Sequence, residues 1–341
     1  TTEIYTLSLH DALPIWCMTP FFLTPTRRNT MFYKPEGISP AMLTAFDDDG
    51  SVNAEVMGDI VDFCYNSGCK MVFTVSSVGE FVHLEVDEAC NLMNIVKKAS
   101  KGRIPVLAGV TASHIEKSIE LAKYAREIGI DAIVCSPPYY YTVTQEIIER
   151  HYEMLAEAVP DMPIVMYNIP LFSTPLSYDL VKRVSQIPNV VAMKDSSGSM
   201  VDLLHFMDKC RLVGSDINLL AGREEIVFPA TMIGCKGAMV GTANIFPEIL
   251  VKIYNATLSG DFETARSLQL AVCLAIRTMF SVPFPLGFKA AMEVRGFRMG
   301  PPKAALTEAD KIRAEGCKKR LHDILSELCE YADIPLIRGR G

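Results

Sequence analysis

The sequence predicts an α/β protein, a (β/α)8 TIM barrel followed by a small C-terminal helical domain. Short apolar runs alternate with amphipathic stretches from Ile38 onward. The runs are apolar throughout, as expected of parallel strands buried on both faces, and their spacing leaves room for one helix and two loops. The predicted strands are Ser39–Leu43, Met71–Val75, Pro105–Val110, Ala132–Ser136, Ile164–Ile169, Val190–Lys194, Ile217–Ala221 and Ala238–Thr242.

Signals for helices and turns lie between these runs. Ser113 followed by Glu116 predicts a capping box at the start of one helix, and Gly129 predicts the end of that helix. The same order of helix, glycine, apolar residue and polar residue recurs at 67–70, 128–131 and 233–236. Eight units favour a closed barrel over an open doubly wound sheet, which usually has a glycine-rich phosphate loop after its first strand. Here the segment after the first run contains a single glycine.

Composition and periodicity divide the chain into three segments. Residues 1–30 mix threonine, proline and aromatic residues without a regular period, and residues 2–15 resemble translated sequencing-adapter DNA. We therefore predict a non-native or disordered N-terminal tail over 1–30, with a functional segment as the alternative. The barrel is predicted over 31–258 and the C-terminal helical domain over 259–341. The clearest helices of that domain are Phe262–Met279, Leu286–Val294 and Glu308–Tyr331.

The composition argues against several classes of function. The 341 residues carry a formal net charge of −7, which is unsuited to general nucleic acid binding. The ten cysteines include no Cys-x-x-Cys pair and no histidines cluster near them, which argues against a metal site. Scattered thiols of this kind predict a reducing, cytoplasmic location. No uninterrupted apolar run reaches the roughly 18 residues that a membrane helix needs.

The strongest chemical signal is a lysine at the end of a buried strand. In this fold functional residues lie at the C-terminal ends of strands, and Lys194 closes the apolar run 190–193. One interpretation is a rim lysine whose ammonium reaches solvent. The other is an amine held in an apolar barrel mouth. Burial there disfavours the charged form and leaves a nucleophile that attacks a ketone.

Tyrosine and serine residues follow other predicted strands. Tyr167 ends the strand before Lys194 and is either a rim aromatic or a proton donor and acceptor. Ser76 and Ser77 begin a turn, either as helix caps or as ligands of a carboxylate. Three consecutive tyrosines, 139–141, are either packing and interface residues or the lining of a wet pocket.

These residues carry a resemblance to a known family. The strongest segments are Val-Met-Tyr-Asn-Ile-Pro at 165–170 and Val-Ala-Met-Lys-Asp-Ser-Ser-Gly at 191–198. Supporting segments are 77–80, 138–141 and 237–244. In this order and at predicted strand ends, they resemble the dihydrodipicolinate synthase / N-acetylneuraminate lyase superfamily. The resemblance covers roughly 36–305.

The resemblance implies a class I, metal-independent aldolase without a bound cofactor. Lys194 then forms a Schiff base with pyruvate or another 2-oxo acid, and Tyr167 is the general acid and base. Ser77 binds the substrate carboxylate and links Tyr167 to Tyr140, which in many members of the family reaches into a neighbouring subunit's site. The resemblance also implies a homotetramer, built as a dimer of dimers.

The chain departs from the family pattern at two positions. Val78 replaces a second hydroxyl of the serine turn, so that only its N–H remains to hold the carboxylate. One lost hydrogen bond costs about 0.5–1.5 kcal/mol. Phe172 stands where the synthase branch has an arginine for the carboxylate of the second substrate. A phenyl ring cannot make that contact, which counts against synthase activity.

The segment after the seventh strand favours a sugar substrate. Sialic acid lyases bind sugar hydroxyls with a Gly-x-Asp-Glu turn, which Gly222, Glu224 and Glu225 resemble; acids that complement a helix dipole are the alternative. With Ser196 as a further substrate-binding candidate, we predict a lyase that cleaves a 2-oxo-3-deoxy sugar acid, such as N-acetylneuraminate or 2-oxo-3-deoxygluconate, to pyruvate and an aldehyde. The alternatives are 4-hydroxy-tetrahydrodipicolinate synthase or a related dehydratase, and a catalytically silent sugar-acid binding protein.

Overall fold

Eight parallel strands form a single sheet in the computed structural model, which describes residues 32–337. Each strand from β2 to β7 pairs with the next in sequence, and β8 pairs with β1. A bridge between Ala41 and Phe73 joins the β1 and β2 sides, so the sheet closes on itself. This confirms the predicted TIM barrel. The strands are β1 Gly37–Pro40, β2 Val72–Thr74, β3 Val106–Gly109, β4 Ala132–Cys135, β5 Ile164–Asn168, β6 Val190–Asp195, β7 Asn218–Ala221 and β8 Gly237–Val240.

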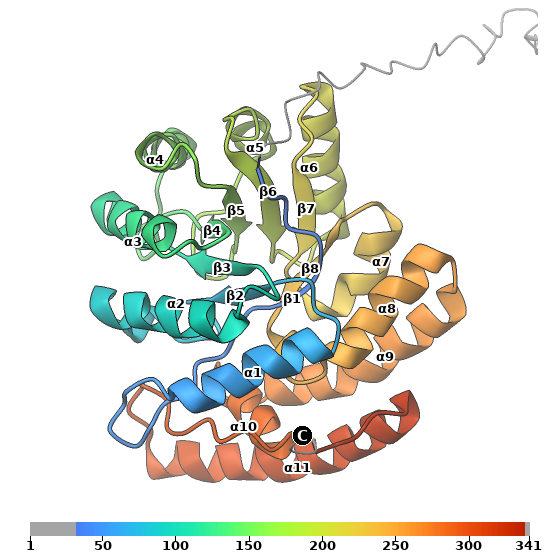
Figure 1. Ribbon diagram of the computed structural model, residues 1–341. Helices are drawn as coiled ribbons and strands as arrows, with labels where there is room; N and C mark the ends of the chain where they lie inside the picture. Colours follow the sequence, from blue (N-terminus) through green and yellow to red (C-terminus); the bar gives the residue numbers. More distant parts are fainter. Residues whose placement is uncertain (1–31, 338–341) are drawn as a thin grey trace, which may run out of the picture.

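Helices surround the barrel, as Figure 1 shows. In the part of the chain described, the first eight follow successive strands and the last three extend the chain beyond β8. Within residues 32–337, no helix has both the length and the apolar character required to span a bilayer. The helices are α1 Ala54–Asn66, α2 Val86–Ser100, α3 Ile115–Glu127, α4 Gln145–Ala158, α5 Tyr178–Val184, α6 Met200–Leu212, α7 Val227–Met232, α8 Pro247–Ser259, α9 Phe262–Met279, α10 Leu286–Val294 and α11 Glu308–Ala332.

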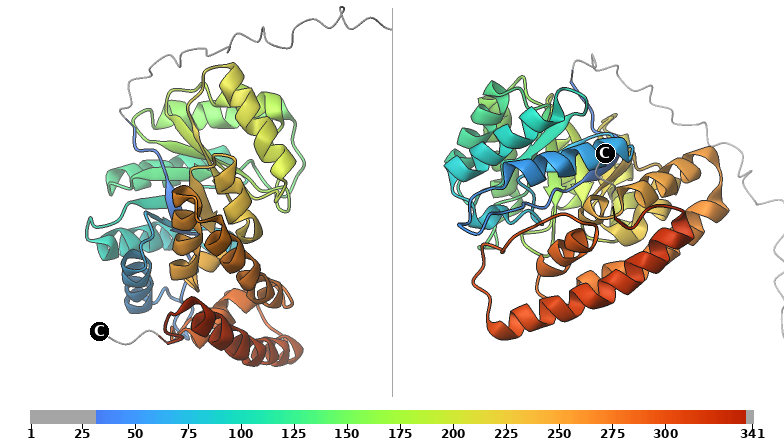
Figure 2. Two further views of the ribbon diagram at one scale, coloured as in Figure 1. Left: turned by 90° about the vertical axis from the view of Figure 1, so that its right-hand side faces the viewer. Right: turned by 60° about the horizontal axis from the view of Figure 1, so that its bottom comes forward.

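The C-terminal helices match their predicted positions. The structure has α9 and α10 with the predicted bounds, and α11 runs one residue further than expected, to Ala332. The long helix α11 lies along one side of the barrel and packs against α9 and α10 (Figure 2). The division at 258/259 into two domains stays a prediction. The tail predicted for 1–30 lies outside the described residues.

Two local predictions are wrong. The helix expected to begin with a Ser113 capping box starts at Ile115, with His114 in the cap position and no side-chain cap. Glu116 instead lies 3.1 Å from the imidazole of His114. The first strand begins at Gly37 rather than Ser39 and ends at Pro40, because the backbone beyond it leaves β8 and bonds to the β2 side.

Two glycines allow the first and last strands to meet. Gly37 and Gly237 are partners in the β1–β8 register. A Cβ atom on Gly237 would lie 2.0 Å from the carbonyl oxygen of Gly37, well inside any allowed contact. The absence of a side chain at this position therefore allows the sheet to close.

We expect Gly237→Ala to destabilise the protein. The added methyl group must displace the β1 backbone, and overpacking of this kind costs about 1–3 kcal/mol. Gly58→Ala in α1 is the matched control, since a Cβ there meets nothing within 4 Å and alanine is the better helix former. Urea unfolding should show a lower midpoint for Gly237→Ala and an equal or higher midpoint for Gly58→Ala. Equal stability of the two variants would contradict this account of closure.

Candidate active site

A cavity of about 240 Å³ opens at the C-terminal ends of the strands. This is the end at which enzymes of this fold place their active sites. Its walls come from the ends of β5, β6 and β7, from the turn after β2 and from the segment around α10. Sequence-predicted site residues in its lining are Ser77, Val78, Tyr167, Phe172, Lys194, Ser196, Gly222 and Glu224.

Lys194 and Tyr167 lie side by side in this cavity. They are direct partners in the register of β5 and β6, and both side chains are buried. The Lys194 Nζ atom lies 4.2 Å from the centroid of the Tyr167 ring and 5.2 Å from that of Phe73. In the described part of the chain, these ring faces rather than a carboxylate are the close partners of the amine. The arrangement holds an amine in an apolar pocket next to a phenol.

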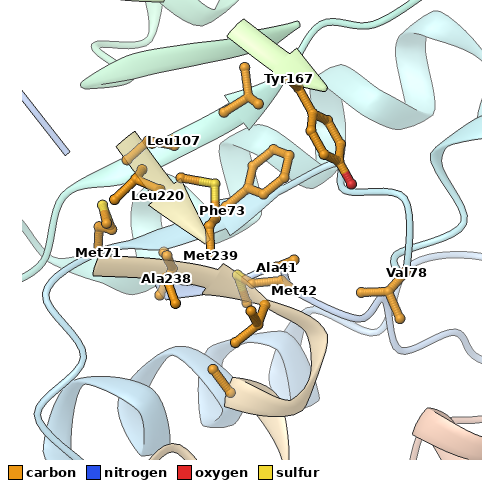
Figure 3. Packing of buried hydrophobic residues seen from close by; sticks show 14 of the residues in the cluster. Ala41, Met42, Met71, Phe73, Val78, Leu107, Tyr167, Leu220, Ala238 and Met239 are labelled. Carbon is orange, nitrogen blue, oxygen red and sulfur yellow. The ribbon is translucent and has the colours of Figure 1, made fainter. Parts of the chain in front are cut away.

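The Tyr167 hydroxyl points out of the packed interior. Figure 3 shows the ring above the apolar core, with its oxygen directed to the side on which Val78 lies. Phe73 and Met239 fill the barrel below. The phenol is therefore anchored by its ring and presents its oxygen to the cavity.

A buried hydrogen-bond network ties β5 to β6 immediately after this pair. The Asn168 side chain donates to an Asp195 carboxylate oxygen at 2.7 Å, and the Ser197 hydroxyl donates to the other oxygen at 2.6 Å. Asn168 in turn accepts from the backbone N–H of Leu176 at 3.0 Å. Burial raises the pKa of Asp195, and the two donors oppose that shift. The network fixes the strand ends that carry Tyr167 and Lys194.

The two serines after β2 have different positions. The Ser76 hydroxyl is buried, donates to the carbonyl of Met42 at 2.8 Å and accepts from the N–H of Gly79. It stabilises the turn. Ser77 is half-buried and lines the cavity together with Val78. Of the two hydroxyls, that of Ser77 is the one available to a substrate.

A buried ion pair holds this turn against α10. Glu80, in the left-handed region, lies 2.7 Å from the ammonium of Lys289, and both side chains are almost fully buried. The backbone N–H of Lys303 donates to the second Glu80 oxygen at 2.9 Å. Burial lowers the pKa of Lys289, while Glu80 opposes that shift. Sequence reasoning missed this link, because its partners are more than 200 positions apart.

The β6 and β7 ends are in tight contact. The Ser196 hydroxyl donates to the carbonyl of Gly222 at 3.2 Å. A Cβ on Gly222 would lie 2.1 Å from that hydroxyl oxygen, so only glycine fits. Both residues line the cavity, as predicted, and their mutual contact accounts for the glycine.

The two acids after β7 do not form the predicted sugar-binding turn. Glu224 is buried and accepts from the backbone N–H of Thr242 at 3.2 Å, and burial raises its pKa. Glu225 is not part of the cavity lining; it pairs instead with Arg223 at 2.9 Å. Glu224 therefore reaches the cavity lining and Glu225 does not, so the two carboxylates are not presented to the cavity as a pair.

Four phenyl rings form the outer wall of the cavity. Phe172 lies 6.1 Å from Phe284 between ring centroids, and Phe284 contacts Phe280 and Phe288. All four line the cavity. The sequence interpretation placed only Phe172 here. Phe280 caps the end of α9, Phe284 lies in the following turn and Phe288 lies in α10, so no helical period in the sequence marked the three rings as one face.

Tyr140 lies away from Lys194. Its side chain is 85% exposed, its φ is +82°, and it contributes to a neighbouring cavity of about 440 Å³ that Tyr139 also lines. Ser77 and Phe172 line both cavities. Within one chain, the predicted link from Tyr167 through Ser77 to Tyr140 is not formed.

Comparison with curated proteins corrects the predicted substrate. The chain is 31% identical to 4-hydroxy-tetrahydrodipicolinate synthase of Caldicellulosiruptor saccharolyticus over 84% of this chain and 96% of the relative. It is 32% identical to the synthase of Methanopyrus kandleri over 85% and 97%. These names support the synthase alternative, so the prediction of a sugar-acid lyase is wrong. The position of Glu225 agrees with this correction.

Solved structures and a family match agree with these relatives. A prophage protein of the dihydrodipicolinic acid synthase family from E. coli, solved in complex with pyruvate, superposes with a TM-score of 0.79 at 26% identity, covering 86% of this chain and 98% of that one. Dihydrodipicolinate synthase from Bacteroides thetaiotaomicron gives 0.77 at 27%, covering 85% and 100%. The chain matches the Dihydrodipicolinate synthetase family over residues 34–326. The chain therefore belongs to the dihydrodipicolinate synthetase family, within the superfamily that its motifs predict.

Proposed function

We propose that this chain is a Schiff-base-forming synthase that joins pyruvate to aspartate semialdehyde, the 4-hydroxy-tetrahydrodipicolinate synthase reaction. The observation that carries the proposal is the buried Lys194 amine, 4.2 Å from the centre of the Tyr167 ring at the barrel mouth. The names of the curated relatives support the choice of semialdehyde. A catalytically silent binding protein does not require a nucleophilic amine at this position.

The chemistry follows from these two residues. The Lys194 amine adds to the keto carbon of pyruvate, and loss of water gives an imine. The imine withdraws electrons, so that the methyl group loses a proton and becomes an enamine carbon. This carbon attacks the aldehyde, forming the new carbon–carbon bond and a hydroxyl group. The amino group of the semialdehyde then displaces Lys194 from the imine carbon, which closes the ring and frees the lysine amine. Tyr167 supplies and accepts the protons of imine formation.

The turn after β2 supplies the carboxylate contacts in this proposal. Ser77 and Val78 line the cavity that contains Lys194, and in the proposal the Ser77 hydroxyl and the Val78 backbone N–H donate to the carboxylate. Ser196 lines the same cavity from β6. A carboxylate bound there directs the keto carbon of pyruvate towards the amine.

Assembly and location extend the proposal. Tyr140 and Tyr141 are 85% and 77% exposed at the rim and pack edge to face. We propose that they contact a second copy of the chain within a homotetramer, where Tyr140 approaches the neighbour's cavity. Cytoplasmic location likewise stays a prediction from cysteine usage.

Sodium borohydride with pyruvate should inactivate the protein and add one pyruvate-derived mass per chain at Lys194. Borohydride reduces an imine to a stable amine, so the adduct marks the nucleophile. Lys194→Ala should abolish the adduct, and so should Lys194→Arg, since a guanidinium stays protonated. Lys252→Ala, at an exposed lysine of α8, is the control and should label normally. Intact-mass and peptide mass spectrometry provide the readout; an adduct elsewhere would exclude Lys194.

Tyr167→Phe should preserve pyruvate trapping but lower turnover roughly 10²–10⁴-fold, the usual contribution of a positioned acid and base. The phenyl ring keeps the packing against Lys194, so the loss isolates the hydroxyl. Tyr331→Phe, at an exposed ring of α11 outside both cavities, is the matched control. Unchanged turnover in Tyr167→Phe would transfer the proton role to another group.

Wild-type protein should consume pyruvate when aspartate semialdehyde is present, and the product should be detected by coupled reduction or by mass. We expect kcat/KM for condensation with the semialdehyde to be at least tenfold higher than kcat/KM for cleavage of 2-oxo-3-deoxy sugar acids. Steady-state kinetics on both substrates provide the comparison. Faster cleavage of the sugar acids would reject the synthase.

A further inference from the structure

The cavity wall contains one cationic side chain besides Lys194. Among the described residues that line the cavity, only Lys194 and Arg223 have cationic side chains. The outer wall next to Arg223 consists of phenyl and aliphatic side chains. Lys194 is consumed in the imine of the proposed reaction. A charged group on the second substrate would therefore meet Arg223 as its cationic partner in this cavity.

The guanidinium of Arg223 is held in a defined orientation. Its Nε and Nη2 atoms donate to the two oxygens of Glu225 at 3.3 and 2.9 Å, and its Cζ atom lies 5.2 Å above the Phe280 ring. One edge of the planar group is thus occupied. The other edge, Nη1 and Nη2, makes no further hydrogen bond within residues 32–337, and an arginine edge of this kind binds a carboxylate through two parallel bonds.

Arg223 keeps its positive charge at this edge although its side chain is only partly exposed. Burial alone would lower the pKa of Arg223, but Glu225, with Glu224 and Tyr167, raises it overall, so the cation is retained. Glu224 lines the same cavity and accepts from the backbone N–H of Thr242, and burial raises its pKa. Arg223 lines the cavity together with Tyr167 and Lys194. The low polarity of the phenyl wall strengthens a contact between opposite charges.

We infer that Arg223 is the specificity-determining residue that binds the carboxylate of the aldehyde substrate, from β7 rather than from the loop after β5. In this inference Phe172, which lines the same cavity, packs against the aliphatic part of that substrate. The inference deepens the proposed function and rests on it for the identity of the semialdehyde. The choice of a carboxylated over an uncharged aldehyde rests on Arg223 alone.

The test compares two aldehydes with the same four-carbon chain, succinic semialdehyde and butanal, each with pyruvate. Wild-type protein should have a higher kcat/KM for succinic semialdehyde. Arg223→Gln should reduce that preference at least tenfold, through KM more than kcat, since a hydrogen bond to a charged group contributes about 1.5–3 kcal/mol and 1.4 kcal/mol is one decade. Arg223→Lys, which keeps charge but not the planar fork, should fall between the two.

Arg277→Gln is the control, because this exposed arginine of α9 does not line the cavity. It should keep the wild-type preference. Borohydride trapping of pyruvate should be normal in Arg223→Gln, which separates the aldehyde contact from imine formation. An equal loss on both aldehydes, or no change in preference, would overturn the inference.

A binding measurement tests the same contact if the protein turns over neither of the two aldehydes. Calorimetry on the enzyme reduced with pyruvate and borohydride should show tighter binding of succinic semialdehyde than of butanal, and Arg223→Gln should remove the difference. Equal binding by wild-type protein would overturn the inference. Failure to use aspartate semialdehyde, with the preference for a carboxylate intact, would instead reject only the proposed function.

Discussion

The pairing of β5 with β6 is the constraint on which the site depends. Parallel register places Tyr167 directly opposite Lys194, and the network around Asp195 fastens the same two strand ends. A shift of β6 by one residue would turn Lys194 to the other face of the sheet, away from Tyr167. The closed barrel prevents such a shift, because every strand is held on both sides. The relative position of Lys194 and Tyr167 is therefore set by backbone hydrogen bonds between the two strands rather than by flexible side chains.

The C-terminal helices belong to the site as well as to the exterior of the fold. Lys289 of α10 holds Glu80, and Glu80 closes the turn that presents Ser77. A buried ion pair of this kind contributes little net stability, since desolvation offsets its attraction, but loss of one partner leaves a buried charge. Its role is therefore one of position. Phe284 and Phe288, near the same helix, complete the cavity wall.

The two halves of the cavity come from different parts of the chain. Strand ends supply Lys194 and Tyr167, whereas turns, loops and α10 supply Ser77, Val78 and the phenyl wall, and Arg223 lies after β7. Strand ends are rigid, and the loops that follow them tolerate change. The loop wall of the cavity can therefore differ between related chains while the amine and the phenol keep their positions.

The sequence by itself determined the barrel, the C-terminal helices and the Lys194–Tyr167 pair, because apolar periodicity and strand-end position are local properties. It did not determine the Glu80–Lys289 ion pair or the orientation of Glu225. These depend on which segments meet across the fold, and the helix-dipole and sugar-binding interpretations of Glu225 were equally compatible with its neighbours in sequence. Only the tertiary structure showed that Glu225 pairs with Arg223 and that Arg223 lines the same cavity as Lys194.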